Sequence, residues 1–569
     1  MSEPQSTELR ALGEEFFHIQ NTTDPLGTTL LGIPGYDALL PDPSRKGARA
    51  SAARLRSIEE KLEKIDRSTF SDADRVDAAV LARLAWGART DLEEGIWETD
   101  ASSEGYASPH AMVFMCVPAV VVSTDTIAQD YLARLSGLGE YFDTITERYA
   151  EAQRDGRYST RAGIARAVDQ LQGHLDLDIT EDLLANPSLD PGFASESFTA
   201  RAREIVKQSV RPAMSRLVEL LNGEMSRHAR DDDHVGVRYV PGGEASYLKA
   251  VRRHTTTELT PQEIHEIGLA RIAELQQEFS DLGERVLGER NVSNVLARLR
   301  EDPKLRFTTS AEIVKVAEDC LQRAESARDA WFPHFNIAEC IVEEVHPIEA
   351  RNAALAHYRP PAADGSRPGA HCILTLEPEK RFRYEYEALS FHESSPGHHF
   401  QIATAQTLSD LPQYRRYLDV QACAFVEGWG LYAERLADEM GLYSSDLARL
   451  GMLSFDALRA CRLVVDTGMH HLGWSRDKAI AYMWDNTATT EANVANEIDR
   501  YIGWPGQALA YMVGKREIQR LREYASNQLG DSFDVRGFHG TVLSNGAVPL
   551  DVLQLLVDQW IATTIRSNS

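Results

Sequence analysis

The sequence predicts a mainly α-helical protein with one small β element, and three observations favour this fold class. Apolar residues recur at helical spacing among charged ones along most of the chain, as at Leu55, Ile58 and Leu62. Runs of β-branched residues are few and short. The composition, 43% hydrophobic and 26% charged over 569 residues, is typical of a globular protein.

The N-terminal half, residues 1–335, is expected to be mostly helical. Apolar residues at helical spacing predict helices over residues 7–100 and 124–225. The segment 105–123 between them fits either a buried helix or a strand. Glycine, proline and aspartate indicate that residues 24–43 form an irregular loop within the first helical region.

Two further elements are expected before the end of this half. Residues 236–243 resemble a short strand followed by a turn. A long helix should start at Pro261, because proline suits the first helical position, Thr260 can cap the helix, and Glu263 completes a capping box. Another helix is expected over residues 309–329.

The second half, residues 336–569, is expected to hold the sheet and then a series of helices. Two runs typical of strands, 339–345 and 370–376, lie on either side of the turn-rich stretch 357–369. Helical patterns follow at 384–407, 417–440, 445–471, 476–487, 493–502, 508–524 and 549–567. Because we find no repeat, low-complexity tract or linker, we expect one large domain, 1–569.

Composition also argues against some partners and locations. The formal net charge of −26 repels phosphate groups, so neither nucleic acid nor an anionic membrane is an expected partner. The N-terminus lacks the regions of a signal peptide, and the longest apolar run, residues 111–122, is too short to span a bilayer. The six cysteines form no CxxC pair and fit reduced, buried thiols. We therefore expect a cytoplasmic protein.

A cluster of histidines near the middle of the second half is the main candidate for chemistry. His392, Glu393, His398 and His399 fall within eight positions, although histidine is sparse elsewhere. Zinc hydrolases often carry HExxH on a helix, where two histidines one turn apart reach one ion and the glutamate acts as a base. Here Pro396 stands where the second histidine of that motif is expected.

Pro396 and Gly397 are expected to bring two of these histidines together. In a straight helix, His398 and His399 would lie roughly 9 and 10 Å along the axis from His392, too far for zinc–nitrogen bonds of about 2 Å. Pro396 cannot donate to the carbonyl of His392, and Gly397 tolerates unusual dihedral angles. Looping out these two residues restores the HExxH spacing. We therefore expect a bulged helix with His392 and His398 as ligands and His399 as the alternate.

Glu427 is the leading candidate for a third ligand of a single zinc ion, with a fourth position left for water. It lies on a predicted helix beside Gly428 and Gly430, which would allow close approach to a neighbouring element. Glu434 lies seven residues on, on the same helix face, and is expected to hold a ligand histidine by its second nitrogen or to be the ligand itself.

These residues resemble the motifs of a large bacterial family, domain-of-unknown-function family 885. Its hallmarks are similar to His392–His399, with the pattern HExxPGHH, and to Glu427–Tyr432. The stretches Thr260–Glu263, Asp364–Gly369 and Arg500–Tyr511 agree with the same family, so the resemblance covers most of the chain. That family resembles the Taq-type zinc carboxypeptidases and, more remotely, angiotensin-converting enzyme and thimet-type oligopeptidases.

The resemblance implies a large helical metallopeptidase-like fold with a deep central cleft and a small sheet beside the metal motif. It also implies a tyrosine late in the chain that stabilises the oxyanion; Tyr511 is the first choice, and Tyr501 and His471 are weaker ones. Glu393 would be the catalytic base. A homodimer is expected only by analogy with the carboxypeptidases.

Several residues are candidates for substrate binding. The strand 370–376, which contains His371, is placed to accept an extended peptide as an added strand. Arg500 is a candidate for receiving a substrate carboxylate, with Tyr501 next to it and Arg367 as a similar candidate. The alternative for Arg500 is an ion pair on the helix surface.

Three functions therefore stay open from the sequence. The first is a zinc-dependent metallopeptidase, most closely a carboxypeptidase, that cleaves peptide bonds with a metal-activated water. The second is a zinc-dependent amidase acting on a small non-peptide metabolite. The third is a catalytically inactive helical binding protein, which the presence of Glu393 disfavours because a structural metal site needs no base.

Overall fold

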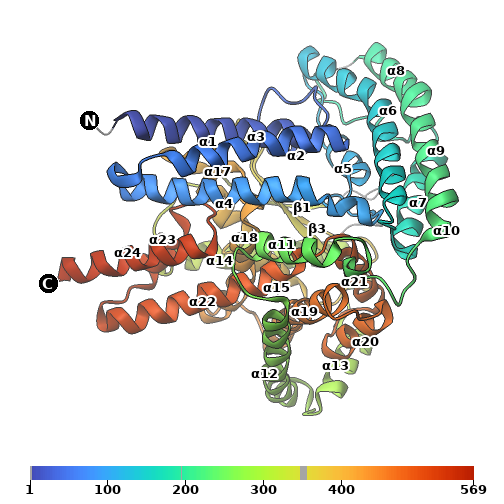
Figure 1. Ribbon diagram of the computed structural model, residues 1–569. Coiled ribbons are helices and arrows are strands. Elements are labelled where there is room, and N and C mark those ends of the chain that lie inside the picture. Colours follow the sequence, from blue (N-terminus) through green and yellow to red (C-terminus); the bar gives the residue numbers. More distant parts are fainter. Residues whose placement is uncertain (1–2, 194, 346–354, 569) are drawn as a thin grey trace.

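Helices dominate the structure, a computed structural model that describes residues 3–193, 195–345 and 355–568 (Figure 1). The helices of the N-terminal half are α1 (Glu3–Thr23), α2 (Pro25–Leu30), α3 (Arg45–Lys64), α4 (Asp72–Glu94), α5 (Pro109–Cys116), α6 (Asp125–Arg154), α7 (Arg161–Asp176), α8 (Glu196–Ile205), α9 (Arg211–Leu220), α10 (Ser226–His228), α11 (Gly243–Thr255), α12 (Pro261–Leu287), α13 (Val292–Glu301) and α14 (Ser310–Ala327).

The second half begins with the three strands of a sheet and continues as helices. The strands are β1 (Cys340–Glu344), β2 (Ala356–Arg359) and β3 (Gly369–Ile373). The helices are α15 (Tyr386–Glu393), α16 (His398–Thr407), α17 (Gln413–Tyr417), α18 (Cys423–Glu439), α19 (Asp446–His470), α20 (Arg476–Asn486), α21 (Glu491–Gly503), α22 (Ala510–Leu529), α23 (Val535–Leu543) and α24 (Leu550–Asn568). The predicted fold class, mainly α with a small sheet, is confirmed.

Some local predictions were wrong. Residues 236–243 form no strand; they contain a single 3₁₀ turn, Val237–Tyr239, that leads into α11. The expected loop 24–43 contains α2, and the turn-rich stretch 357–369 contains most of β2. These elements are short, so tertiary contacts decide their conformation more than local propensity does.

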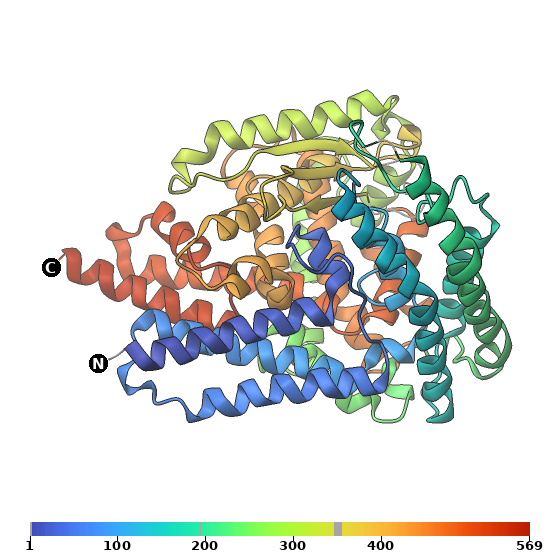
Figure 2. The same cartoon turned by 90° about the horizontal axis from the view of Figure 1, so that it is seen from above.

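The described residues pack around two main hydrophobic cores. The larger one joins α1, α3 and α4 to α12 and to the helices from α15 to α24. The other lies mostly within the helices from α5 to α9. Figures 1 and 2 show these helices standing together at one side of the molecule. The single domain expected over 1–569 therefore contains two cores and stays a prediction.

β3 is the central strand of the sheet, which has the order β1-β3-β2. It pairs in parallel with β1 and antiparallel with β2, and all five of its residues are buried. Both hydrogen-bonding edges of β3 are therefore occupied. The expectation that the strand 370–376 accepts a substrate peptide as an added strand was wrong, because only an edge strand has free backbone groups.

Helices α18 and α22 cross in backbone contact. A methyl group added at Gly514 would lie 1.8 Å from the carbonyl oxygen of Ala424, and one added at Gly428 would lie 2.5 Å from the α-carbon of Gly514. A side chain at either position would force the helices apart. The crossing therefore fixes how far the residues that precede it on each helix, Glu427 and Tyr511, lie from each other.

Replacing Gly514 by alanine should destabilise the protein by about 3 kcal/mol or more, because the backbone it would meet cannot move without separating two core helices. Urea unfolding of the metal-free protein measures the effect. Gly173 is a matched control, since it is exposed within α7 and has no atom within 4 Å of an added methyl group. Gly173→Ala should stabilise the protein by up to about 1 kcal/mol. Equal midpoints for the two variants would contradict the proposed role of the crossing.

Candidate metal centre

The helix that carries the histidine cluster is broken rather than bulged. α15 ends at Glu393 and α16 begins at His398, so four residues, 394–397, leave the helix. The peptide bond between Ser395 and Pro396 is cis. The break has the cause expected from the sequence, because proline has no N–H for the carbonyl of His392. A continuous helix with a two-residue bulge was nevertheless the wrong form.

The break brings His392 and His398 face to edge. Their ring centroids lie 4.6 Å apart with an interplanar angle of 86°. A carboxylate oxygen of Glu427, from α18, lies 3.8 Å from Nε2 of His392 and 3.4 Å from Nε2 of His398. The three possible ligand atoms all lie within 4.8 Å of one another. The structure therefore gathers the three residues that the sequence singled out as ligands.

The donor set fits a zinc ion. Bonds of 2.0–2.1 Å in tetrahedral geometry separate two ligand atoms by roughly 3.3 Å, which is close to both distances from Glu427. Gly430 makes room for the set, since an added methyl group would meet Cε1 of His392 at 2.8 Å and Cε1 of His398 at 3.0 Å. Two nitrogen donors and one carboxylate leave a fourth position for water, as in catalytic rather than structural zinc sites.

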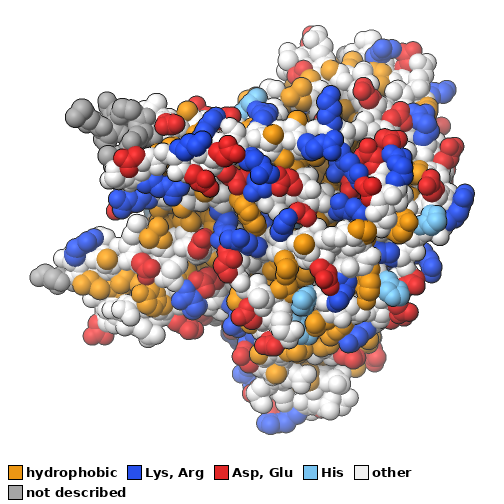
Figure 3. Space-filling view, in the orientation of Figure 1, with side chains coloured by type: hydrophobic (Ala, Val, Ile, Leu, Met, Phe, Trp, Pro, Cys, Tyr) orange, Lys and Arg blue, Asp and Glu red, His pale blue; other side chains and the backbone are white. Residues whose placement is uncertain are grey.

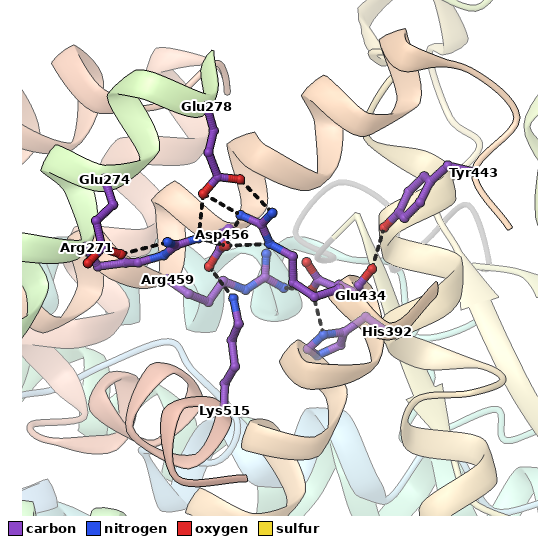
Figure 4. A network of polar contacts seen from close by, with 10 residues as sticks. Arg271, Glu274, Glu278, His392, Glu434, Tyr443, Asp456, Arg459 and Lys515 are labelled. Atoms are coloured by element: carbon purple, nitrogen blue, oxygen red, sulfur yellow. Dashed lines mark hydrogen bonds and ion pairs between the residues drawn. The ribbon is translucent and has the colours of Figure 1, made fainter. Parts of the chain in front are cut away.

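Glu434 contacts the ring nitrogen of His392 that faces away from Glu427. Its carboxylate oxygen lies 2.8 Å from Nδ1 of His392, and Arg459 approaches the same oxygen at 3.5 Å (Figure 4). Tyr443 donates a hydrogen bond to the backbone carbonyl of Glu434 at 3.2 Å. Because Glu434 occupies Nδ1 of His392, the other ring nitrogen, Nε2, is left for the metal. Of its two expected roles, Glu434 therefore has the geometry of the one that orients a histidine.

His399, the alternate ligand, lies against the sheet. Its Nδ1 is 3.0 Å from the hydroxyl of Tyr358 on β2, and an added methyl group at Gly369 would meet the same nitrogen. Burial lowers the pKa of His399 to about 4. The geometry therefore favours His398 over His399.

Histidine and carboxylate groups in the cluster shift each other's pKa values, so that an ion pair forms when no metal is bound. Burial would lower the pKa of His392, but Glu427 and Glu434 together raise it to about 9. Burial would likewise raise the pKa of Glu427, but His392 and His398 hold it well below its usual range. Since Glu427 is ionised and His392 carries the proton, binding of a metal ion would displace that proton from His392.

Glu393 and Tyr511 adjoin this cluster, Glu393 in the sequence and Tyr511 in space, and their polar groups have no hydrogen-bond partner among the described residues. Glu393 directly follows His392 and is half-buried; its carboxylate makes no hydrogen bond or ion pair within the described part of the chain. The ring of Tyr511 lies 6.4 Å from that of His392, nearly parallel to it. Burial and Glu427 raise the pKa of Tyr511 to about 12, so its hydroxyl stays protonated at neutral pH.

Arg500 and Tyr501 lie near Tyr511, in a cluster that includes an arginine the sequence did not indicate. Arg462 of α19 places its guanidinium 4.2 Å from the ring centre of Tyr511. Arg500 donates to the side chain of Gln507 at 3.0 Å. Tyr501 is buried, and its hydroxyl is already occupied, because it accepts from Arg462 at 2.6 Å and donates to Glu497.

The remaining predicted site residues lie in other surroundings. His371 is buried in β3 with Nε2 at 3.4 Å from the hydroxyl of Ser390, and burial lowers its pKa to about 4. Arg367 donates to the backbone carbonyl of Leu30 at 3.0 Å. His471 lies at the end of α19, where its carbonyl accepts from Arg238. Arg367 and His471 therefore contact parts of the chain other than the histidine cluster.

A mostly helical chain with a buried two-histidine, one-carboxylate centre defines a class, that of large helical proteins with a candidate metal site. Within it, this chain belongs to the family described as "Bacterial protein of unknown function (DUF885)", which matches residues 25–557. The predicted family is thereby confirmed. The resemblance of the family to zinc peptidases stays a prediction.

Two solved structures share the fold over nearly the whole chain. One is a putative lipoprotein from Colwellia psychrerythraea, with 26% identity, a TM-score of 0.91, and coverage of 98% of this chain and 99% of that one. The other is a putative lipoprotein of unknown function from Shewanella oneidensis, with 18% identity, a TM-score of 0.73, and coverage of 96% and 98%. No curated protein matched.

Zinc affinity should depend on pH. Because the pKa of His392 in the metal-free protein is raised to about 9, a proton must leave before Nε2 can bind a metal. Apparent affinity should therefore rise about tenfold per pH unit between neutral pH and about 9, and level off above it. Competition with a zinc chelator across this range measures it. Glu434→Gln should flatten the slope, because the amide no longer stabilises the protonated imidazole; an unchanged slope would contradict this origin.

Proposed function

We propose that this protein is a zinc-dependent hydrolase that cleaves peptide bonds, most closely a carboxypeptidase. The observation that carries the proposal is the convergence of His392, His398 and Glu427, with Glu393 directly after His392 in the sequence and without a hydrogen bond or ion pair among the described residues. A structural site would need four protein ligands and no base. Here a base follows directly after a ligand.

The protein's own groups supply the proton transfers. Bound zinc would lower the pKa of its water and polarise the scissile carbonyl. The carboxylate of Glu393 has no competing partner among the described residues, so it is free to take a proton from that water and pass it to the leaving amine. The hydroxyl of Tyr511 stays protonated and is free to donate a hydrogen bond to the oxygen that becomes negative.

The cations beside Tyr511 favour a substrate with a free carboxylate. Arg462 and Arg500 share one carboxylate, Glu497, at 2.8 and 3.4 Å. In addition, Nη1 of Arg462 is buried without a hydrogen-bond partner among the described residues. Glu104 also attracts Arg500, so the unused donor of Arg462, rather than a net positive charge, marks the place for a carboxylate. On the face in Figure 3 both signs of charge are interspersed, whereas Arg462 and Arg500 are largely buried. A C-terminal carboxylate would meet the two guanidinium groups as a bidentate partner.

The other expectations from the sequence complete the proposal. A small amide would use the same zinc, base and hydroxyl, so an amidase differs from a peptidase only in substrate. The expected cleft, a homodimer and a peptide partner remain predictions.

None of the described helices combines the length and apolar character of a membrane span. The cytoplasmic location finds no support, because both similar structures are described as putative lipoproteins.

Glu393→Gln should abolish hydrolysis of a mixed peptide library while zinc is still bound, because the amide cannot accept a proton. A loss of about 10³-fold or more is expected for a base that acts in every step. Glu427→Gln should instead lose zinc. Both are measured by metal analysis together with peptide mass spectrometry.

Glu266→Gln is the matched control, since His265–Glu266 in α12 is a second His-Glu dipeptide that lies apart from the three candidate ligands. It should retain both zinc and activity. Hydrolysis that survives in Glu393→Gln, or a wild-type protein that binds no zinc, would rule the proposal out.

Arg500→Gln should raise KM for peptides with a free C-terminus and leave C-terminally amidated peptides unaffected. The loss of one charge-assisted contact corresponds to about 10- to 100-fold in kcat/KM. A set of paired free and amidated peptides measures the ratio in wild type and variant. Equal rates for the two forms in the wild type would show that the arginines do not recognise a carboxylate.

A further inference from the structure

A second polar site lies on the other side of the supporting network. A pocket of about 390 Å³ opens between α12, α18 and α22, and none of the three candidate metal ligands lines it. Figure 4 shows the polar network that runs from His392 and Glu434 towards its floor. The volume is near the lower end for small-molecule sites, which suits a ligand of one or two amino-acid residues.

The floor of this pocket is rich in cations. The buried carboxylate of Asp456 receives Lys515 at 2.7 Å, Arg271 at 2.8 Å and Arg435 at 2.5 Å. Both arginines also pair with Glu278, and Arg271 pairs in addition with Glu274, so three carboxylates offset the three cations. What the floor offers a ligand is therefore spare N–H donors rather than a net positive charge.

Lys515 brings unused hydrogen-bond donors to this floor. Its side chain is 2% exposed, and Asp456 is the sole hydrogen-bond acceptor that its ammonium group has in the described part of the chain. An ammonium group carries three donors. Burial, opposed by Asp456 and reinforced by Arg435 and Arg271, lowers the pKa of Lys515 to about 8, so the group stays mostly charged at neutral pH.

The rim of the pocket has the opposite character. Glu274, Asp438 and Glu439 line it with side chains that are 61, 33 and 46% exposed, and each is already paired with an arginine. Arg516 is exposed beside them and has no ion pair within the described residues. Unused donors thus lie at the floor and on Arg516, whereas partly exposed carboxylate oxygens lie at the mouth.

We propose that this pocket binds a small zwitterion, an α-amino acid or a dipeptide. The ligand's carboxylate would accept from Lys515 and Arg516, where donors lack acceptors. Its ammonium group would face the carboxylates of Glu274 and Glu439 at the mouth. A ligand with one charge alone would use only one end of the pocket: a lone carboxylate would leave the rim carboxylates unmatched, and a lone ammonium group would leave the donors of Lys515 and Arg516 without acceptors. The inference stands on these charges and needs no hydrolytic activity.

Isothermal titration calorimetry of the full chain with L-alanine tests the proposal, with acetate and ethylammonium as probes that carry one charge each. L-alanine should bind, and each single-charge probe should bind at least about tenfold more weakly. Arg516→Gln and Lys515→Met should each weaken L-alanine about tenfold, the loss expected for one charge-assisted hydrogen bond. Glu274→Gln should weaken L-alanine but not acetate.

Arg520→Gln is the matched control. Arg520 lies one turn after Arg516 on the same helix, is exposed, and pairs with Glu517 outside the pocket. Its variant should bind L-alanine as the wild type does. Because Arg516 and Glu274 are exposed, their variants test the site even if Lys515→Met does not fold. Absence of heat with L-alanine, acetate that binds as tightly as L-alanine, or equal effects of Arg516→Gln and Arg520→Gln would each overturn the proposal.

Discussion

The close approach of α18 to its neighbours is the constraint on which both polar sites depend. Gly428 lets α22 touch its backbone, and Gly430, two residues on, lets both imidazoles of the histidine cluster lie against it. A glycine costs a helix roughly 1 kcal/mol relative to alanine, so the helix gives up intrinsic stability at both positions. In return, Glu427 reaches the histidines and Tyr511 stands beside them. The same helix then carries Glu434 and Arg435 towards the network in Figure 4.

The buried charges show how a strongly acidic chain keeps ionic groups in its interior. Asp456 has three cationic partners, and Glu434 lies between His392 and Arg459. Charges taken out of water need partners at short range, because the desolvation cost otherwise exceeds the Coulomb attraction. Removing one partner from such a network leaves an uncompensated charge, so these contacts hold α12, α18, α19 and α22 in register as effectively as apolar packing does.

Local signals predicted much of the fold. The start of α12 follows from Thr260 and Glu263, which form the expected capping box, because a cap involves only four neighbouring residues. β2 escaped prediction because its pairing with β3 depends on residues farther along the chain, from Arg359 with Ala370 to Ala356 with Ile373. Likewise, the pairing of His392 with His398 was foreseen from Pro396, but the length of the break was not. Where the chain re-enters a helix depends on its packing against α18.

The site was predictable where chemistry constrains residue type and spacing, and less so where only geometry does. Two histidines and a following glutamate form a pattern that ligand chemistry explains. Arg462 had no such signal, because it is one of several charged residues on α19 and the sequence gives no indication of what each of them faces. Tyr501 illustrates the converse: it is adjacent to Arg500 in sequence, yet its hydroxyl is used in the core.

The break after Glu393 gives a bound metal a mechanical role. In an unbroken HExxH helix both histidines belong to the same helix, so a bound ion adds little to the stability of that helix. Here His392 lies in the last turn of α15, His398 is the first residue of α16, and Glu427 comes from a third helix, α18. An ion held by all three would act as a cross-link that joins three separate elements and closes a chain loop of more than thirty residues. Such a link restricts the unfolded chain as a disulfide does. A metal ion that acts in catalysis would therefore also stabilise the folded state.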